Sequence, residues 1–124
     1  MRSPIVNVRN VKPGYPYYAR INPANFWKMV VAKTTPQLTG TDSELKDGLV
    51  RLALGPQLTT DEIVGNDIAT NMDGSPLDEN FSPADFAEFV VHGMLTDPEV
   101  GSIAKEYFFS RAVLEEAGII PKAA

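Results

Sequence analysis

The sequence predicts a mainly α-helical fold, with four to five short helices in a compact bundle behind an extended N-terminal arm that carries a short β-strand. Helix-start signals, each a capping residue and often a proline after it, recur from Asn22 onward. Apolar residues return at helical spacing behind these signals. The first 21 residues instead combine β-branched residues with three prolines, which disfavours a helix there.

The predicted arm comprises residues 1–21. Val6 and Val8 alternate with polar residues, as in a short strand, and Pro13-Gly14 is a turn signal. The segment after this turn is expected to be extended, because Pro16 pushes the residue before it out of the α region. An arm this short does not bury both of its faces. It must therefore lie on its own domain, as an edge strand or strap, or on a neighbouring subunit.

The helical domain is expected to span residues 22–124. Asn22 as N-cap, followed by proline, starts a first helix that ends near Lys33. Capping-box spacing starts the second helix at Thr41, and Gly55 ends it. Its apolar residues share one face: Leu45, Leu49 and Leu52.

A shorter third helix is predicted after Thr59, which has Glu62 at capping-box spacing, although Gly65 weakens it. The residues that follow favour a turn. Asparagine, aspartate, glycine and proline gather in residues 71–76, so a surface loop or small hairpin is expected there, continuing to Asn80.

Two more helices complete the predicted bundle. Ser82 caps one that ends near Gly93. Asp97 caps the longest, which is expected to run to about Ala117 before Gly118 ends it.

The two halves of the chain show a similar order of elements. Pro-Ala-Asn-Phe begins at Pro23 and Pro-Ala-Asp-Phe at Pro83, and a second capping residue follows in each half. One interpretation is a duplicated helical hairpin over 22–55 and 82–118. The other is chance, since all helix starts draw on the same few residue types. Both stay open at this point.

The formal net charge of −5 conceals a division along the chain. Up to Thr41 there are six basic residues and no acidic one, a formal charge of +6. From Asp42 onward there are five basic and 16 acidic residues, a formal charge of −11. Because basic and acidic regions of one molecule attract different surfaces, this division bears on the choice of partner.

Enzymatic chemistry has no positive signal in the sequence. With no cysteine there is no disulfide, thiolate zinc site or cysteine nucleophile. His92 is the only histidine, and with Glu88 four residues earlier it makes an ordinary helical contact rather than a metal site, which needs three or four ligands. An EF-hand register over the turn would place Ala69 and Asn80 where carboxylates are required. We expect a non-enzyme with no catalytic residue, metal or cofactor.

No apolar stretch approaches the roughly 20 residues that a membrane helix needs. The first residues lead into no apolar signal region. We therefore expect no membrane partner and a cytoplasmic location during synthesis.

The arm supplies the candidate interface. Tyrosine and arginine are favoured interface anchors, and prolines keep the arm extended at reduced entropic cost. One class of partner is other protein subunits, in a homo- or hetero-oligomer whose acidic helical faces receive the arm. The alternative is DNA or RNA, since cations neutralise phosphates and tyrosine rings stack on bases, although the acidic body would repel a long polyanion. The candidate residues are Arg2, Arg9, Lys12, Tyr15, Tyr17, Tyr18 and Arg20.

An extended, proline-containing arm such as Ser3-Pro4-Ile5-Val6-Asn7-Val8, joined to a small acidic helical domain, resembles the small virion structural proteins of tailed bacteriophages. These include head–tail connector, head-completion and capsid-associated proteins. The resemblance is to this general type and assigns no residue a function. It implies a non-enzymatic role in a symmetric particle, a location in the virion, and an arm that reaches onto neighbouring subunits.

Overall fold

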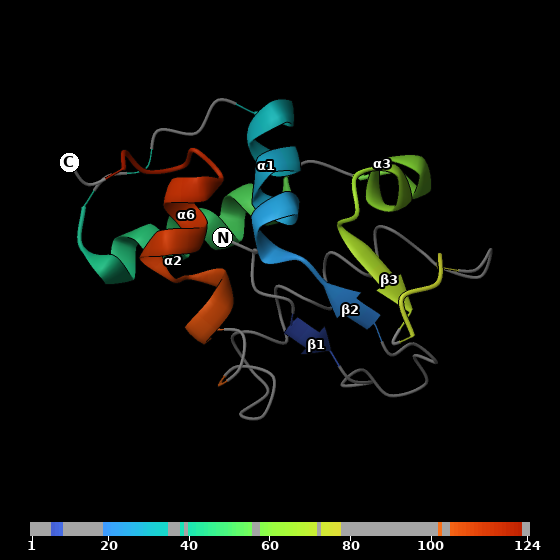
Figure 1. The fold of residues 1–124 in the computed structure, drawn as a ribbon. Helices are drawn as coiled ribbons and strands as arrows, with labels where there is room; N and C mark the ends of the chain where they lie inside the picture. Colours follow the sequence, from blue (N-terminus) through green and yellow to red (C-terminus); the bar gives the residue numbers. More distant parts are fainter. Residues whose placement is uncertain are drawn as a thin grey trace.

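A computed structural model describes residues 6–8, 19–34, 38, 40–55, 58–71, 73–77, 102 and 105–122. The fold is mainly helical with a short sheet, which confirms the predicted class. The elements in chain order are β1 (Val6–Val8), β2 (Ala19–Ile21), α1 (Pro23–Lys33), α2 (Asp42–Leu54), α3 (Thr60–Gly65), β3 (Ala69–Asn71) and α6 (Arg111–Glu116) (Figure 1).

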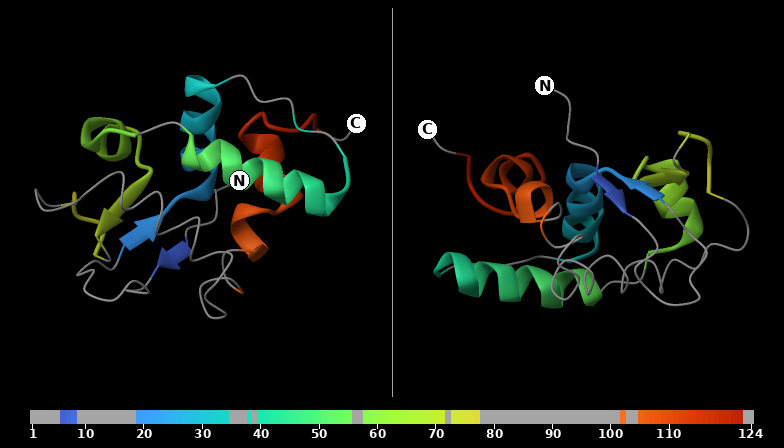
Figure 2. Two further views of the ribbon diagram at one scale, coloured as in Figure 1. Left: turned by 180° about the vertical axis from the view of Figure 1, so that it is seen from behind. Right: turned by 90° about the horizontal axis from the view of Figure 1, so that it is seen from below.

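Helix α1 lies at the centre of the described fold. Helices α2 and α6 lie on one side of it, and the sheet and α3 lie on the other (Figures 1 and 2). Three of its side chains, Phe26, Trp27 and Val30, are fully buried. The Phe26 ring meets the rings of Trp27 and Phe108 edge to face, at centroid distances of 5.1 and 6.0 Å, an arrangement that aromatic pairs favour. The core is therefore built around α1.

The start and end of α1 are those that the sequence predicts. The Asn22 side-chain oxygen accepts a hydrogen bond from the Asn25 backbone N–H at 3.2 Å, as an N-cap should. The Asn22 backbone N–H donates to the Ile68 carbonyl at 2.9 Å, so the same residue also ties the helix to the start of β3. At the other end, the Thr34 hydroxyl donates to the Val30 carbonyl at 2.8 Å.

The three strands form one antiparallel sheet in the order β1-β2-β3. Arg20 in β2 pairs with Asn7 on one side and Thr70 on the other. The sheet includes strands from both sides of the predicted boundary between the arm (residues 1–21) and the helical domain (residues 22–124), because β3 lies in the helical domain. Of the two predicted places for the arm, its strands β1 and β2 take the one on their own domain. The sequence predicts a surface loop or small hairpin from residue 71 onward, but β3 begins at Ala69 and pairs with β2, a long-range pairing that was not predicted.

The caps of α2 and α3 agree with the predicted spacing. The Thr41 hydroxyl accepts from the Glu44 N–H at 3.3 Å at the start of α2. Thr59 and Glu62 form a complete capping box at the start of α3. Among the α2 leucines predicted to share a face, Leu49 is fully buried, and the other two are half-buried against the core.

Helix α3 ends in a motif that glycine usually closes. Asp67 has φ +52°, in the left-handed region. Its N–H donates to the Val64 carbonyl at 3.3 Å, and the Ile68 N–H donates to the Ile63 carbonyl at 2.9 Å, the two bonds of a Schellman motif. An aspartate thus occupies a backbone conformation that a side chain makes less favourable.

The long last helix predicted from Asp97 to Ala117 is wrong in its C-terminal part. Residues 105–108 are helical, and a new helix, α6, begins after Ser110. The Ser110 hydroxyl accepts from the Val113 N–H at 3.2 Å and donates to the Tyr107 carbonyl at 3.3 Å. A serine that bonds the backbone in this way favours a helix start over a helix interior. The chain therefore bends between the two helical segments.

The bend leaves a backbone carbonyl for another partner. The Trp27 indole N–H donates to the Phe108 carbonyl at 3.0 Å in a buried hydrogen bond. Helix α6 ends as predicted, because Gly118 has φ +82° and the Ile119 N–H donates to the Leu114 carbonyl at 2.9 Å.

The predicted turn at residues 71–76 is confirmed in its described part. The Asn71 N–H donates to the Ser75 carbonyl at 2.9 Å, and Gly74 has φ +89°. The predicted helix from Ser82 to Gly93, and most of the second hairpin of the suggested duplication, lie outside the described residues.

Substituting Ser110→Ala is expected to lower the free energy of unfolding by about 1 kcal/mol, because it removes the N-cap of α6. Urea unfolding with an unchanged m-value measures the effect. Ser102→Ala, at an exposed helical position, is the matched control and is expected to change stability by less than about 0.5 kcal/mol. Equal effects of the two substitutions would contradict the assignment of this cap.

Substituting Asp67→Gly is expected to raise the free energy of unfolding by roughly 0.5–1 kcal/mol, because glycine adopts the left-handed conformation without a steric penalty. Thermal unfolding of the two proteins measures the change. Asp67→Asn removes the charge and keeps a side chain, so it separates the backbone effect from electrostatics. A glycine variant less stable than the parent would show that the strain is absent.

Candidate interaction site

Of the seven candidate interface residues, the described part of the chain includes Arg20 alone. It lies in the middle strand of the sheet and is half-buried. The other candidates lie outside the described residues, so their positions stay predictions: Arg2, Arg9, Lys12, Tyr15, Tyr17 and Tyr18.

The strand register determines where the arm leaves and rejoins the sheet. Val8, the last residue of β1, pairs with Ala19, the first of β2. Residues that face each other in an antiparallel pair have Cα atoms roughly 4.5–5.5 Å apart. The two residues that flank the segment of residues 9–18, Val8 and Ala19, are therefore neighbours in one sheet. Five of the seven candidate residues belong to this segment, which is attached to the body at both ends.

Strand β1 is an edge strand in the described structure. Among the described residues its only strand partner is β2, and the sheet order places β3 on the far side of β2. An edge strand presents backbone N–H and C=O groups that another extended segment can pair with. The start of the arm thus offers backbone groups to which another extended segment can hydrogen-bond.

Among the described basic residues in the first third of the chain, Lys28 and Lys33 pair with acidic residues of the body. Lys33 Nζ lies 2.7 Å from Glu62 Oε1, and both side chains are 27% exposed. Lys28 Nζ lies 3.9 Å from Glu116 Oε1 at more exposed positions. Both lysines belong to α1, so part of the basic charge counted in the sequence is used within the fold. The basic residues of the arm in the sequence are Arg2, Arg9, Lys12 and Arg20.

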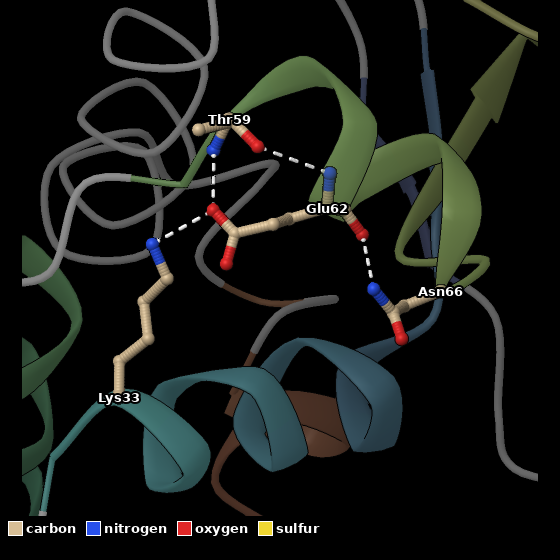
Figure 3. Close-up of polar contacts among 4 residues, drawn as sticks. All are labelled: Lys33, Thr59, Glu62 and Asn66. Atoms are coloured by element: carbon tan, nitrogen blue, oxygen red, sulfur yellow. Dashed lines mark hydrogen bonds and ion pairs between the residues drawn. The ribbon is translucent and has the colours of Figure 1, made fainter.

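The Lys33–Glu62 pair belongs to a network at the start of α3 (Figure 3). Glu62 Oε1 also accepts from the Thr59 backbone N–H at 3.0 Å, and the Glu62 N–H donates to the Thr59 hydroxyl at 3.2 Å. The Asn66 side-chain amide donates to the Glu62 carbonyl at 2.8 Å. The hydrogen bond from Lys33, followed by that from the Thr59 backbone, lowers the pKa of Glu62. The carboxylate is therefore ionised at neutral pH and ties the end of α1 to the start of α3.

A second group of polar residues closes the turn after β3. Asp73 Oδ1 accepts from the Ser75 hydroxyl at 2.6 Å and from the Ser75 N–H at 2.9 Å. These two bonds lower the pKa of Asp73, the hydroxyl having the larger effect. The Asn71 amide donates to Ser75 Oγ at 3.0 Å and to the Pro76 carbonyl at 2.7 Å. The polar atoms of this turn thus satisfy one another.

In the described part of the chain, no three histidine, aspartate or glutamate side chains lie close enough together to hold a metal ion. His92 and Glu88 lie outside that part of the chain. In the same residues, none of the helices has the length and apolar character needed to cross a membrane.

One cluster of charged residues was not expected from the sequence. A cavity of about 300 Å³ is lined by Lys46 of α2, by Arg111 of α6 and by Lys105, which lies in the helical stretch before Ser110. Sequence spacing gives no signal for it, because the first lysine is far along the chain from the other two. The only clue was compositional: basic residues are scarce after Asp42.

Comparison of the chain with protein-family models, curated proteins and solved structures finds no match. The functional inferences below therefore depend on the charge, strand pairing and packing of the chain itself.

Substituting Glu62→Gln is expected to lower stability at pH 7, because glutamine keeps a capping acceptor but loses the ion pair with Lys33. The folded pKa of Glu62 is lowered, so its stabilisation is complete above the unfolded pKa of about 4.3 and is lost as the pH falls through the folded pKa. The difference in free energy of unfolding between the variant and the parent should therefore be smaller at pH ~3 than at pH 7.

Urea unfolding at both pH values measures this difference. Glu106→Gln, at an exposed position, removes the same charge as a control. A difference that is independent of pH would contradict the ionic contribution of Glu62.

Proposed function

We propose that the protein is a non-enzymatic structural subunit of a larger assembly, and that residues 9–18 and edge strand β1 contact neighbouring subunits. The observation that carries this proposal is the pairing of Val8 with Ala19. It attaches a basic, tyrosine-containing segment at both ends, which reduces the entropy that the segment loses on binding. Strand β1 beside it supplies a backbone edge for the same contact.

Charge supports a contact between unlike surfaces. Residues 9–18 carry Arg9 and Lys12 and no acidic residue, whereas the chain from Asp42 onward has a formal charge of −11. Complementary potentials speed association and select the partner. A contact between the arm of one copy and the acidic body of another is head-to-tail, so it closes into a ring or continues as a lattice.

The assembly that fits this proposal best is a symmetric virus particle. The small virion structural proteins of tailed bacteriophages, the type that the sequence resembles, act in such a particle. A connector, head-completion or capsid-associated position would place copies of the arm beside repeated acidic neighbours. The protein would then be present in the cytoplasm during synthesis and in the virion afterwards.

The test is the native mass of the protein as a function of concentration, alone and with any protein that co-purifies. The double variant Arg9→Glu/Lys12→Glu reverses the charge between the strands. We expect the parent protein to form oligomers or a complex, and the variant to lose at least about tenfold in association affinity. Deleting residues 1–20 is less suitable, because it removes β1 and most of β2.

Arg51→Glu/Lys122→Glu is the matched control. It makes the same change in net charge at exposed positions outside the arm and should keep the native mass of the parent. A parent protein that stays monomeric at high concentration and has no co-purifying partner would overturn the proposal. Equal loss of association in both double variants would show that net charge matters and the arm does not.

The same variants test the nucleic-acid alternative. Steeply salt-dependent binding of single-stranded DNA by the parent, lost in Arg9→Glu/Lys12→Glu with no change of native mass, would replace the assembly proposal with nucleic-acid binding.

A further inference from the structure

A cavity of about 300 Å³ lies between α2, α6 and the residues that flank α6. We call it the cationic pocket. The residues that line it are Leu45, Lys46, Leu49, Lys105, Phe109, Arg111, Leu114 and Ile120.

Part of the pocket wall is apolar. Leu49 and Leu114 belong to the buried core and are at most 1% exposed, so they lie beneath the surface of the pocket. Leu45, Phe109 and Ile120 are half-buried and supply the apolar surface that a ligand can reach. A ligand with a small apolar part would therefore remove some of this surface from water.

Among the described residues that line it, the polar ones are all basic. Five basic residues occur from Asp42 onward, and three of them, Lys46, Lys105 and Arg111, line this pocket. Positive charge is thus concentrated at one cavity of a region whose formal charge is −11. Local charge around a low-dielectric cavity focuses the field that an incoming ion experiences.

The three cations are not equally available. Arg111 Nε lies 3.1 Å from Glu115 Oε1, so this arginine already shares its charge with a carboxylate. Lys46 and Lys105 have no ion pair within the described residues. A ligand anion would therefore meet the two lysine ammonium groups first.

We propose that the cationic pocket binds a small amphiphilic carboxylate, with its acid group at Lys46 and Lys105 and a hydrocarbon or aromatic body against Leu45, Phe109 and Ile120. The volume is at the lower end of small-molecule sites, which suits a body of medium chain length. A polyanion such as nucleic acid fits less well, because the region from Asp42 onward has a formal charge of −11 and repels it. This proposal does not depend on the assembly role of the arm.

The experiment is a titration of the ¹⁵N-labelled full chain with octanoate, followed by amide chemical shifts. Octanamide, of the same chain length and uncharged, is titrated in parallel. We expect shifts centred on α2 and residues 105–120, and an octanoate dissociation constant between roughly 10 µM and 1 mM. Octanamide should bind at least about tenfold more weakly, and added salt should weaken octanoate binding.

Two double variants locate the anion. Lys46→Glu/Lys105→Glu is expected to weaken octanoate binding at least about tenfold, since it replaces attraction with repulsion. Arg51→Glu/Lys122→Glu makes the same change in net charge away from the pocket and should leave the affinity within about twofold of the parent.

Three results would overturn the proposal: no shift at the pocket at millimolar octanoate, equal binding of octanoate and octanamide, or equal loss in the two double variants. Because native mass is not the readout, failure here is distinguishable from failure of the assembly role.

Discussion

The hydrogen bond from the Trp27 indole N–H to the Phe108 carbonyl joins parts of the chain that are 81 residues apart. Both side chains are fully buried. Such a bond contributes only about 1 kcal/mol net, but leaving either group buried and unpaired costs roughly 1–3 kcal/mol. The carbonyl accepts this bond at the place where the C-terminal helical segment stops and Ser110 caps a new helix. The bend sets the direction of α6, and with it the position of Arg111 and Leu114 at the cationic pocket.

Helix α1 is also joined to the sheet and α3, which lie on the other side of the fold. Asn22, its N-cap, bonds Ile68 beside β3, and Lys33 at its end pairs with Glu62 in α3. The sheet and α3 are thereby held to the same helix that Trp27 joins to the C-terminal region (Figure 1). Strand β2 continues into α1 through Ile21 and Asn22, so the arm begins from a fixed element. Both proposed binding surfaces thus depend on one central helix and its single tryptophan.

Local chemistry explains which features the sequence could predict. The side chains of Asn22 and Thr59 cap helices by accepting from backbone N–H groups three positions along the chain, and Gly118 closes α6 through bonds within five positions. Each of these local features can be read from sequence spacing. Strand β3 has only three residues, too few for alternation to show, and it exists because β2 pairs with it. The break at Ser110 lies inside an apolar pattern of helical spacing, and the Phe108 carbonyl beside it bonds a tryptophan that is distant in sequence. The sequence gives the number of charges but not their positions in the fold. Lys33 counts toward the basic first third of the chain, yet in the structure it pairs with Glu62. Lys46 and Lys105 line one cavity, although their spacing in the sequence gives no sign of it.

Hydrogen–deuterium exchange of the indole N–H tests the central role of Trp27 most directly, because the chain has one tryptophan and hence one indole signal. A buried, hydrogen-bonded N–H exchanges only when the surrounding core opens. We predict that this proton exchanges at the rate set by global unfolding, in step with the slowest backbone amides of α1, and that the rate follows the free energy of unfolding measured in urea. Exchange as fast as that of an exposed indole, under conditions where the protein stays folded, would contradict the account.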